Sequence, residues 1–532
     1  MKILLNFSNL GYLNYHFFCE SLKKKIKNIE FVAIRTKNSF VHEYLKNQKE
    51  VDYTITESEP KFDCDKFEID YEYLNFFEKN ILKCSVWKVI ASDRSLGKAY
   101  ENGVREKDFD SKFKNDRNYL LKYFAYRVQC IKKDFEFYKP DYFIPAIAMG
   151  SIDTIIYSQL AKFYGIEYAV LNWLRIDNYC SFSYDHELNI KFLEKELKDS
   201  IEKNFDKKMS PEVEELYKKT INKTTESGLT KNTNSKVDKS INYFEKYKLF
   251  FKIFGWPILI CKAIYVSLKN NIYHLINKKK NFDSSAKKIN ILNIFYGIYR
   301  EFFSKIVYYN EVIKSKKTGL NFLPNNEKYI YFPLQVQPEY ATNIQATMWM
   351  NNLNIIENLS KSIPHDWYVY VKEHPAMTMD RVRPKNFHSK IISYPNVRLL
   401  NVNIDSNKVV INSKAVMSTS GTTAFDAILI GKPVIETRIN IWSNIKLSKT
   451  CTNVEDIYNA IFEETNRINK ISQNERDQLI KHYFDLVLKF GFKQENIKEA
   501  FYNHIGNDQD YKKCGYSMAE GFLKYLNYLK EI

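Results

Sequence analysis

Residues 415–435 read AVMSTSGTTAFDAILIGKPVI, and this stretch decides the fold class. The short apolar run 415–417 predicts a buried strand, and 422–430 carries apolar residues at the spacing of a helix. The following GKPVI turns the chain back into a strand. A strand, a helix and a further strand at this spacing predict a parallel α/β unit.

The same alternation extends outward from this unit. Before it come a predicted helix over 345–360 and strands at 329–334, 367–372 and 397–400. The N-terminal part repeats the pattern, with helices at 15–25 and 153–164 and strands at 2–7, 31–34, 140–147 and 168–171. The chain is therefore predicted to hold two doubly wound parallel sheets of the α/β class.

A long connection of different composition separates the two sheets. Residues 193–240 are polar, which predicts exposed helix followed by a mobile link. In residues 241–280, large apolar and aromatic residues alternate with lysines. That pattern suits an anionic membrane surface or a helical hairpin packed on its own domain. We expect an N-terminal domain at 1–192, a connection with a helical insertion at 193–325, a second α/β domain at 326–460 and C-terminal helices at 461–532.

The composition limits the class of protein. The chain has 532 residues, 45% of them hydrophobic, and a net charge of 80 − 63 = +17. This hydrophobic content excludes an intrinsically disordered chain, and the charge predicts attraction to nucleic acid, anionic lipid or phosphorylated substrates. The eight cysteines include no C-x-x-C pair, the start has no signal-peptide pattern, and no run of about 18 apolar residues is present. We therefore expect a cytoplasmic protein without a zinc site or a membrane span.

Polar loops follow three strands of the second domain. Ligands of open parallel sheets bind beyond the carboxyl ends of the strands, so these loops are candidate binding sites. The first loop, QVQPEYATN, offers Gln335 and the acidic Glu339, and it also suits a turn that caps the next helix. The second loop, KEHP, holds Lys372, His374 and Pro375. A histidine can donate to a phosphate or give up a proton near neutral pH.

The third loop, STSGTT, predicts a phosphate site. It places Ser418, Thr419, Ser420, Gly421 and Thr422 between a strand and the start of a helix. Free backbone N–H groups and the helix dipole favour an anion there, and a glycine allows it to approach closely. A plain hydroxyl N-cap would need only one of these side chains, so we favour the anion site.

Together the three loops resemble a known family. FPLQVQPE, YVKEHP and STSGTTAFDAILIGKPVI are similar, in this order, to the C-terminal half of bacterial capsule polysaccharide biosynthesis glycosyltransferases, notably the Kdo transferases. The bacterial polysialyltransferases share a similar His-Pro and Ser/Thr arrangement. The resemblance implies a metal-independent GT-B enzyme, in which two Rossmann-like domains face each other across a cleft. It also implies a CMP-activated acidic sugar as donor and no further cofactor.

The resemblance assigns roles in the second domain. His374 and Pro375 match the His-Pro motif that contacts the nucleotide phosphate in such enzymes. Ser418, Thr419 and Ser420 match the Ser/Thr motif that binds the same phosphate. Here the loop reads Ser-Thr-Ser instead of a plain Ser-Ser pair, so the resemblance does not select one hydroxyl.

The catalytic acid–base group should come from the N-terminal domain, where Asp93 and Asp153 are the candidates. Asp93 also suits a helix cap, which is the more frequent role of an aspartate in such a place. The expected partners are the nucleotide-sugar donor, a glycan or lipid-linked glycan acceptor and the anionic inner face of the cytoplasmic membrane.

Other functions remain open at this point. A transferase that uses a UDP- or GDP-sugar, or a CDP-alcohol polymerase of the teichoic acid type, would need similar loops. A non-enzymatic nucleic-acid-binding protein would also explain the charge. However, the sequence has no RNP, KH or zinc motif, and its basic residues are spread along the chain, so we expect no nucleic acid partner.

Overall fold

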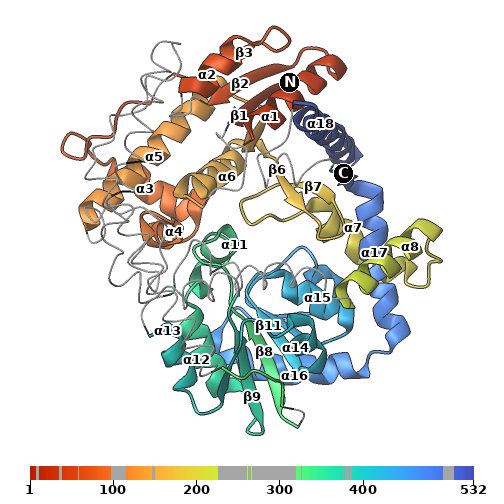
Figure 1. Ribbon diagram of the computed structural model, residues 1–532. Coiled ribbons are helices and arrows are strands. Elements are labelled where there is room, and N and C mark those ends of the chain that lie inside the picture. Colours follow the sequence, from red (N-terminus) through yellow and green to blue (C-terminus); the bar gives the residue numbers. More distant parts are fainter. Residues whose placement is uncertain are drawn as a thin grey trace.

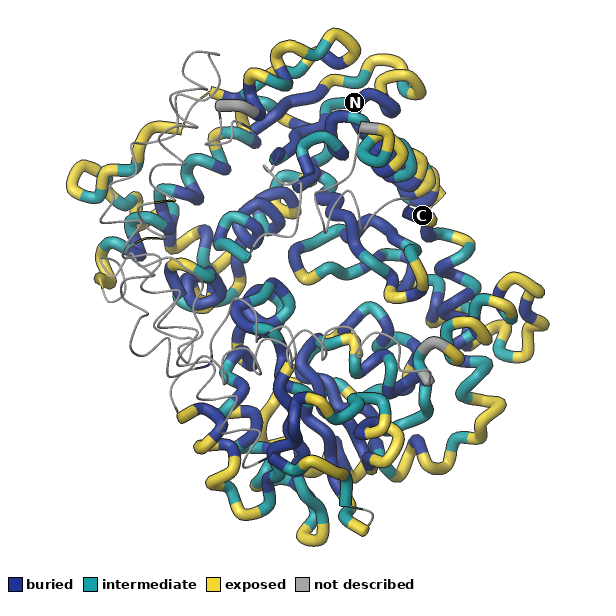
Figure 2. The backbone as a smooth tube through the Cα atoms, in the orientation of Figure 1, coloured by how far each residue is buried: buried dark blue, intermediate teal, exposed yellow. Residues whose placement is uncertain are grey.

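Two parallel sheets, each flanked by helices, dominate the fold (Figure 1). The computed structural model describes residues 1–7, 11–34, 39–57, 59–97, 116–145, 150–225, 261, 265, 319–324, 326–374, 377, 383, 386–494 and 508–531. The central strands of both sheets are deeply buried (Figure 2).

The N-terminal sheet has the order β3-β2-β1-β4-β5, and all its strands are parallel. These strands are β1 (Lys2–Asn6), β2 (Glu30–Ile34), β3 (Tyr53–Ile55), β4 (Tyr142–Pro145) and β5 (Glu167–Tyr168). Ile3, Leu4 and Leu5 of β1 are all fully buried, because helices cover both faces of the sheet. The helices are α1 (Tyr12–Lys25), α2 (Ser39–Lys46), α3 (Tyr71–Phe76), the π-helix η1 (Phe77–Leu82), α4 (Val86–Ser92), α5 (Arg117–Tyr138) and α6 (Ile152–Tyr164).

The C-terminal sheet has the order β10-β9-β8-β11-β12-β13, again parallel. Its strands are β8 (Lys328–Pro333), β9 (Trp367–Lys372), β10 (Val397–Leu400), β11 (Ala415–Ser418), β12 (Val434–Glu436) and β13 (Lys449–Thr450). Counted along the chain from β8, this is the order 3-2-1-4-5-6 of a Rossmann fold, with its switch point between β8 and β11. The two Rossmann-like domains confirm the predicted GT-B fold class.

Short helices connect the strands of the second domain. They are α11 (Tyr340–Asn343), η4 (Thr347–Trp349), α12 (Asn352–Ser362), α13 (Phe387–Ile392), α14 (Ser406–Asn412), α15 (Thr422–Ile430), η6 (Ser443–Ile445) and η7 (Val454–Asp456). The predicted helix at 345–360 was placed too early. The Asn351 side chain accepts the N–H groups of Leu353 and Asn354, so α12 begins at Asn352.

The polar composition predicted that the helical part of segment 193–225 is exposed. The structure instead buries one face of it. Helices α7 (Lys191–Asn204) and α8 (Pro211–Thr225) bury Leu193, Leu197 and Val213 in the same core as α15 and α17 (Gln473–Phe490). Both helices are amphipathic, and their many charged residues occupy only the outer face. The predicted membrane-docking stretch 241–280 lies outside the described residues, apart from positions 261 and 265.

The C-terminal helices are shared between the two domains. Helix α16 (Ile457–Lys470) packs on the C-terminal sheet, whereas α18 (Asp508–Glu531) lies along α1 of the first domain (Figure 1). Gly515 permits this approach, since a Cβ there would lie 2.5 Å from the carbonyl oxygen of Asn14. The last strand, β14 (Phe492–Lys493), completes a small sheet with β6 (Val170–Trp173) and β7 (Tyr179–Ser183). In the described part of the chain, no helix combines the length and the apolar character that crossing a membrane requires.

Candidate functional site

Four loops meet at the carboxyl edge of the C-terminal sheet. Strands β9, β8, β11 and β12 are consecutive neighbours, and parallel strands all end at the same edge. A hydrogen bond of 3.3 Å from the backbone N–H of Thr437 to the carbonyl of Ser418 links the two loops that follow β11 and β12. This edge faces the N-terminal domain, where α11, which follows β8, lies between the two sheets (Figure 1).

The STSG loop (Ser418–Gly421) connects β11 to α15. Ser418, Thr419 and Ser420 are all buried. The Ser418 hydroxyl accepts a hydrogen bond of 3.1 Å from the N–H of Gly421, and the Ser420 hydroxyl donates to the carbonyl of Ala341 at 2.9 Å. A Cβ at position 421 would lie 3.2 Å from the Ser418 hydroxyl oxygen. The absence of a side chain at Gly421 therefore leaves room for another group to approach the start of α15 closely.

Gln335 extends from the loop after β8 into the STSG loop. When its amide oxygen faces the loop, that oxygen accepts backbone N–H groups from Thr419 at 3.3 Å and from Ser420 and Gly421 at 3.1 Å. The amide nitrogen then donates to the Thr419 hydroxyl at 2.5 Å. The opposite orientation leaves only contacts of 3.4 and 3.5 Å with the hydroxyls of Ser418 and Ser420. We therefore assign the first orientation, which satisfies more donors and acceptors.

The geometry around Gln335 shows what the STSG loop can bind. Three consecutive backbone N–H groups converge on a single oxygen atom at the N-terminal end of a nine-residue helix. The helix dipole adds partial positive charge at this point. The same arrangement suits a phosphate oxygen better than a neutral amide oxygen, because the attraction grows with the negative charge of the acceptor.

A buried ion pair connects the loops after β8 and β9. Glu373 receives two hydrogen bonds from the Arg383 guanidinium, at 2.9 and 3.0 Å, and lies 3.1 Å from Nε2 of His388. Arg383 also donates to the side chain of Gln337 and to the carbonyl of Gln335, both at 2.6 Å. Burial opposes ionisation of Glu373, but Arg383 and His388 outweigh it, and the pKa of Glu373 lies well below its usual value.

This ion pair holds the predicted phosphate-contacting residue. The backbone N–H of His374 donates to the Glu373 carboxylate at 2.8 Å, and the His374 side chain is exposed at the sheet edge. Pro375, the other half of the predicted His-Pro motif, lies outside the described residues. Glu373 was part of the quoted KEHP loop but received no predicted role, and no local spacing signals that Arg383, ten residues later, is its partner.

Lys372 points away from the STSG loop. Its ammonium group lies 2.8 Å from the Ser406 hydroxyl at the start of α14, and the residue is 2% exposed. Burial lowers the pKa of Lys372 to about 8, and the nearby Asp405 opposes this shift. The structure thus places Lys372 at the correct sheet edge but beside a different loop.

Glu339 and α11 belong to the contact between the domains. Glu339 is the N-cap residue of α11, which agrees with the alternative prediction of a capping turn. The Tyr340 hydroxyl next to it donates to the carbonyl of His186 in the N-terminal domain. The Gln345 amide donates to the carbonyl of Glu187 at 2.7 Å. The loop after β8 therefore contacts both the STSG loop and the facing domain.

The two predicted acid–base residues lie near the start of α6 in the N-terminal domain. The Asp93 carboxylate accepts backbone N–H groups from Ser95, Leu96 and Ile152 at 2.7–2.9 Å. Burial raises the pKa of Asp93, and these three hydrogen bonds oppose the shift. Asp153 forms a bidentate pair with Arg127, at 2.9 and 3.1 Å.

The carboxylates of Asp93 and Asp153 differ in how accessible their contacts leave them. Asp93 is buried and acts as a cap, as its alternative prediction stated, whereas the Asp153 side chain is 30% exposed beside its arginine. No group of three or more His, Cys, Asp or Glu side chains suited to a metal ion occurs among the described residues.

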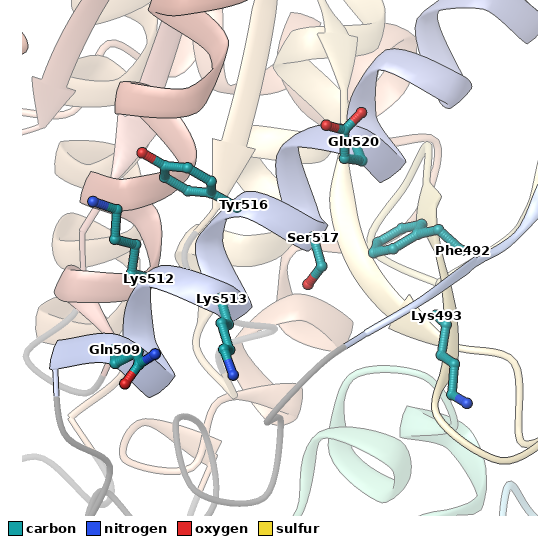
Figure 3. Close-up of a pocket in the computed structure, with 8 residues that line it drawn as sticks. All are labelled: Phe492, Lys493, Gln509, Lys512, Lys513, Tyr516, Ser517 and Glu520. Atoms are coloured by element: carbon teal, nitrogen blue, oxygen red, sulfur yellow. The ribbon is translucent and has the colours of Figure 1, made fainter.

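A separate cavity of about 630 Å³ lies between α18 and β14 (Figure 3). Its described lining comprises Phe492, Lys493, Gln509, Lys512, Lys513, Tyr516, Ser517 and Glu520. None of the predicted site residues belongs to it. The candidate loops at the carboxyl edge of the C-terminal sheet are therefore separate from this cavity.

Comparison with known proteins identifies the region that carries these loops. Residues 266–480 match the family model of capsule polysaccharide biosynthesis proteins. This segment of the chain is therefore similar to capsule-synthesis proteins. This match confirms the predicted resemblance to that family and includes β8–β12 together with the STSG loop.

Other similarities are more distant. Protein FixF of Sinorhizobium fredii (strain NBRC 101917 / NGR234) is 24% identical over 152 residues, which are 28% of this chain and 32% of that protein. The β-Kdo 2,7 transferase KpsC of Thermosulfurimonas dismutans aligns over 34% of this chain and 53% of its own, at 15% identity and a TM-score of 0.22. A UDP-GlcNAc 2-epimerase of Neisseria meningitidis aligns over 92% and 98%, at 12% identity and a TM-score of 0.22.

The chain spans about a third of the length of its curated relative and about half of the KpsC chain.

Proposed function

We propose that this protein is a glycosyltransferase of surface polysaccharide biosynthesis, and that its donor is a CMP-activated acidic sugar such as Kdo or a nonulosonate. The observation that carries the proposal is the convergence of the Thr419, Ser420 and Gly421 N–H groups on one oxygen at the start of α15. It lies within the segment that matches the capsule-synthesis family, and His374 stands on a nearby loop of the same edge.

The proposed chemistry is electrostatic. A phosphate oxygen of the donor takes the place of the Gln335 amide oxygen on the three N–H groups, and the exposed His374 imidazole donates to the departing CMP phosphate. Fixed donors aimed at developing negative charge are usually the largest catalytic contribution. The Glu373–Arg383 pair holds the backbone of His374 and of Gln335, the two residues that border this place from the loops after β9 and β8.

An N-terminal-domain carboxylate accepts the proton of the acceptor hydroxyl in this proposal. Asp153 is the better placed of the two candidates, because its side chain is partly exposed whereas Asp93 is occupied by three backbone N–H groups. We further propose a lipid-linked glycan acceptor at the inner face of the cytoplasmic membrane. The lysine-rich apolar stretch 241–280 supports that location.

The test is donor binding followed by transfer. Thermal unfolding of the full chain is measured with CMP, CDP, UDP and GDP, since a ligand that binds only the native state raises the melting temperature. We expect the largest rise with CMP; a rise only with UDP or GDP would identify a different donor, and one with CDP alone would favour a CDP-alcohol polymerase.

Transfer is then measured with CMP-Kdo and CMP-N-acetylneuraminate for the intact protein and two histidine variants. His374→Ala should lower turnover about a hundredfold or more, the usual effect of losing one such donor. His365→Ala is the matched control, because His365 is exposed in the same domain just before β9. Equal turnover of the His374 variant and the intact protein would remove His374 from the mechanism.

A further inference from the structure

Arg438 bridges the two domains beside the STSG loop. It lies two residues beyond β12, and Thr437, its neighbour, is hydrogen-bonded to the carbonyl of Ser418. The guanidinium donates to the Asn440 side chain at 2.9 Å and to the carbonyl of Glu187, in the N-terminal domain, at 2.8 Å. Arg438 therefore stands at the same sheet edge as the proposed phosphate site and reaches the facing domain.

The charge of Arg438 is not neutralised by the described residues. Both of its hydrogen-bond acceptors are neutral oxygens, and no carboxylate among the described residues forms an ion pair with it. The carboxylate of nearby Glu436 is already engaged by the side chains of Asn440, Trp442, Ser443 and Ser448. A partly buried guanidinium that meets only neutral oxygens has lost hydration without gaining a counter-charge.

Electrostatics point in the same direction. Burial lowers the pKa of Arg438, although the carboxylates of Glu187, Glu436 and Asp185 oppose the shift. An arginine has five N–H donors in a planar fork, and described acceptors engage two of its nitrogens once each. The remaining donors match the geometry of a phosphate or carboxylate group.

We propose that Arg438 binds an oxyanion of the donor and is a specificity-determining residue of this site. The inference rests on the proposed function and deepens it. The oxyanion is either the nucleotide phosphate or the carboxylate of the acidic sugar, since both are anionic groups whose oxygen pairs accept hydrogen bonds from a guanidinium fork. A guanidinium that contacts the donor and also the Glu187 carbonyl joins the donor-binding domain to the facing domain.

The experiment compares the full-length protein with Arg438→Gln and Arg438→Lys by isothermal titration with CMP, cytidine and CMP-Kdo. Arg398→Gln is the matched control, because Arg398 is an arginine of the same sheet that pairs with Glu327 at the opposite strand ends. The melting temperature of each variant without ligand shows whether it folds. If Arg438→Gln does not fold, Arg438→Lys, which keeps the charge but not the fork, serves in its place.

If the phosphate is the partner, Arg438→Gln should bind CMP about tenfold or more weakly, while cytidine binding is unchanged. If the sugar carboxylate is the partner, CMP binding should be unchanged and CMP-Kdo should bind about tenfold or more weakly. Wild-type affinity of Arg438→Gln for both ligands, or an equal loss for cytidine, would overturn the inference and leave Arg438 as a domain bridge. If the intact protein bound none of the ligands, the proposed function would fall together with this inference.

Discussion

Breaking the Glu373–Arg383 pair is the sharpest test of how the site is held. Both side chains are almost completely buried, with exposed fractions of 6% and 3%, and they share two hydrogen bonds of 2.9 and 3.0 Å. Arg383→Met leaves the Glu373 carboxylate buried, and among the described residues its remaining hydrogen-bonding partners are His388 and the backbone N–H of His374. Removing one partner of such a pair costs about 3–5 kcal/mol.

The assay is urea unfolding at pH 7, followed by far-ultraviolet circular dichroism. Arg383→Met should lower the free energy of unfolding by about 3–5 kcal/mol, and the double variant Glu373→Gln/Arg383→Met should recover part of the loss, because no buried charge is then left unpaired. The control Arg398→Met breaks a more exposed pair with Glu327, 3.5 Å apart, and should cost about 1 kcal/mol or less.

Acid adds a second readout. The pKa of Glu373 in the folded protein lies below its value in the unfolded chain, so its contribution is complete above about pH 4.3 and is lost as the pH falls further. The intact protein should therefore lose more stability between pH 7 and pH 3 than Arg383→Met does. Equal costs of Arg383→Met and Arg398→Met at pH 7 would refute the claim that this pair supports the loops.

Three further predictions concern the same sheet edge. Because the folded-state pKa of Lys372 is about 8, below the unfolded value of about 10.4, Lys372 adds about 2.5 kcal/mol of stability between pH 8 and pH 10.5, so the difference in free energy of unfolding between the intact protein and Lys372→Met should change by that amount in urea unfolding. Gln335→Glu should raise the melting temperature and weaken CMP binding about tenfold or more, since its carboxylate would hold the three N–H groups; tighter CMP binding would contradict the assigned contact. Transfer activity should survive EDTA, and its abolition with rescue by magnesium or manganese would show a metal-dependent reaction.

The pattern of elements was readable from the sequence. Apolar runs separated by helical periodicity predicted both sheets, and the strands at 329–334 and 367–372 agree with β8 and β9 to within one residue. The position of the candidate loops followed as well, because parallel strands end at one edge. Hydroxyl groups before a helix predicted an anion site at 418–422, and the structure adds converging N–H groups there. Such features depend on local spacing, which a single sequence contains.

The partners of individual side chains were decided only by the tertiary structure. Gln335 contacts the STSG loop, which lies 83 or more residues later in the sequence. Arg438 contacts Glu187, which lies 251 residues earlier. The tyrosine hydroxyl of Tyr516 in α18 accepts a hydrogen bond from Lys24 of α1 across 492 residues. No periodicity relates such positions, because the order of strands in a sheet and the crossing of helices bring them together. For the same reason Lys372 lies beside Ser406, although its place in the chain had assigned it to the phosphate site. The pleat of β9 sets the direction of its side chain, and the packing of α14 on that face determines which residue it contacts.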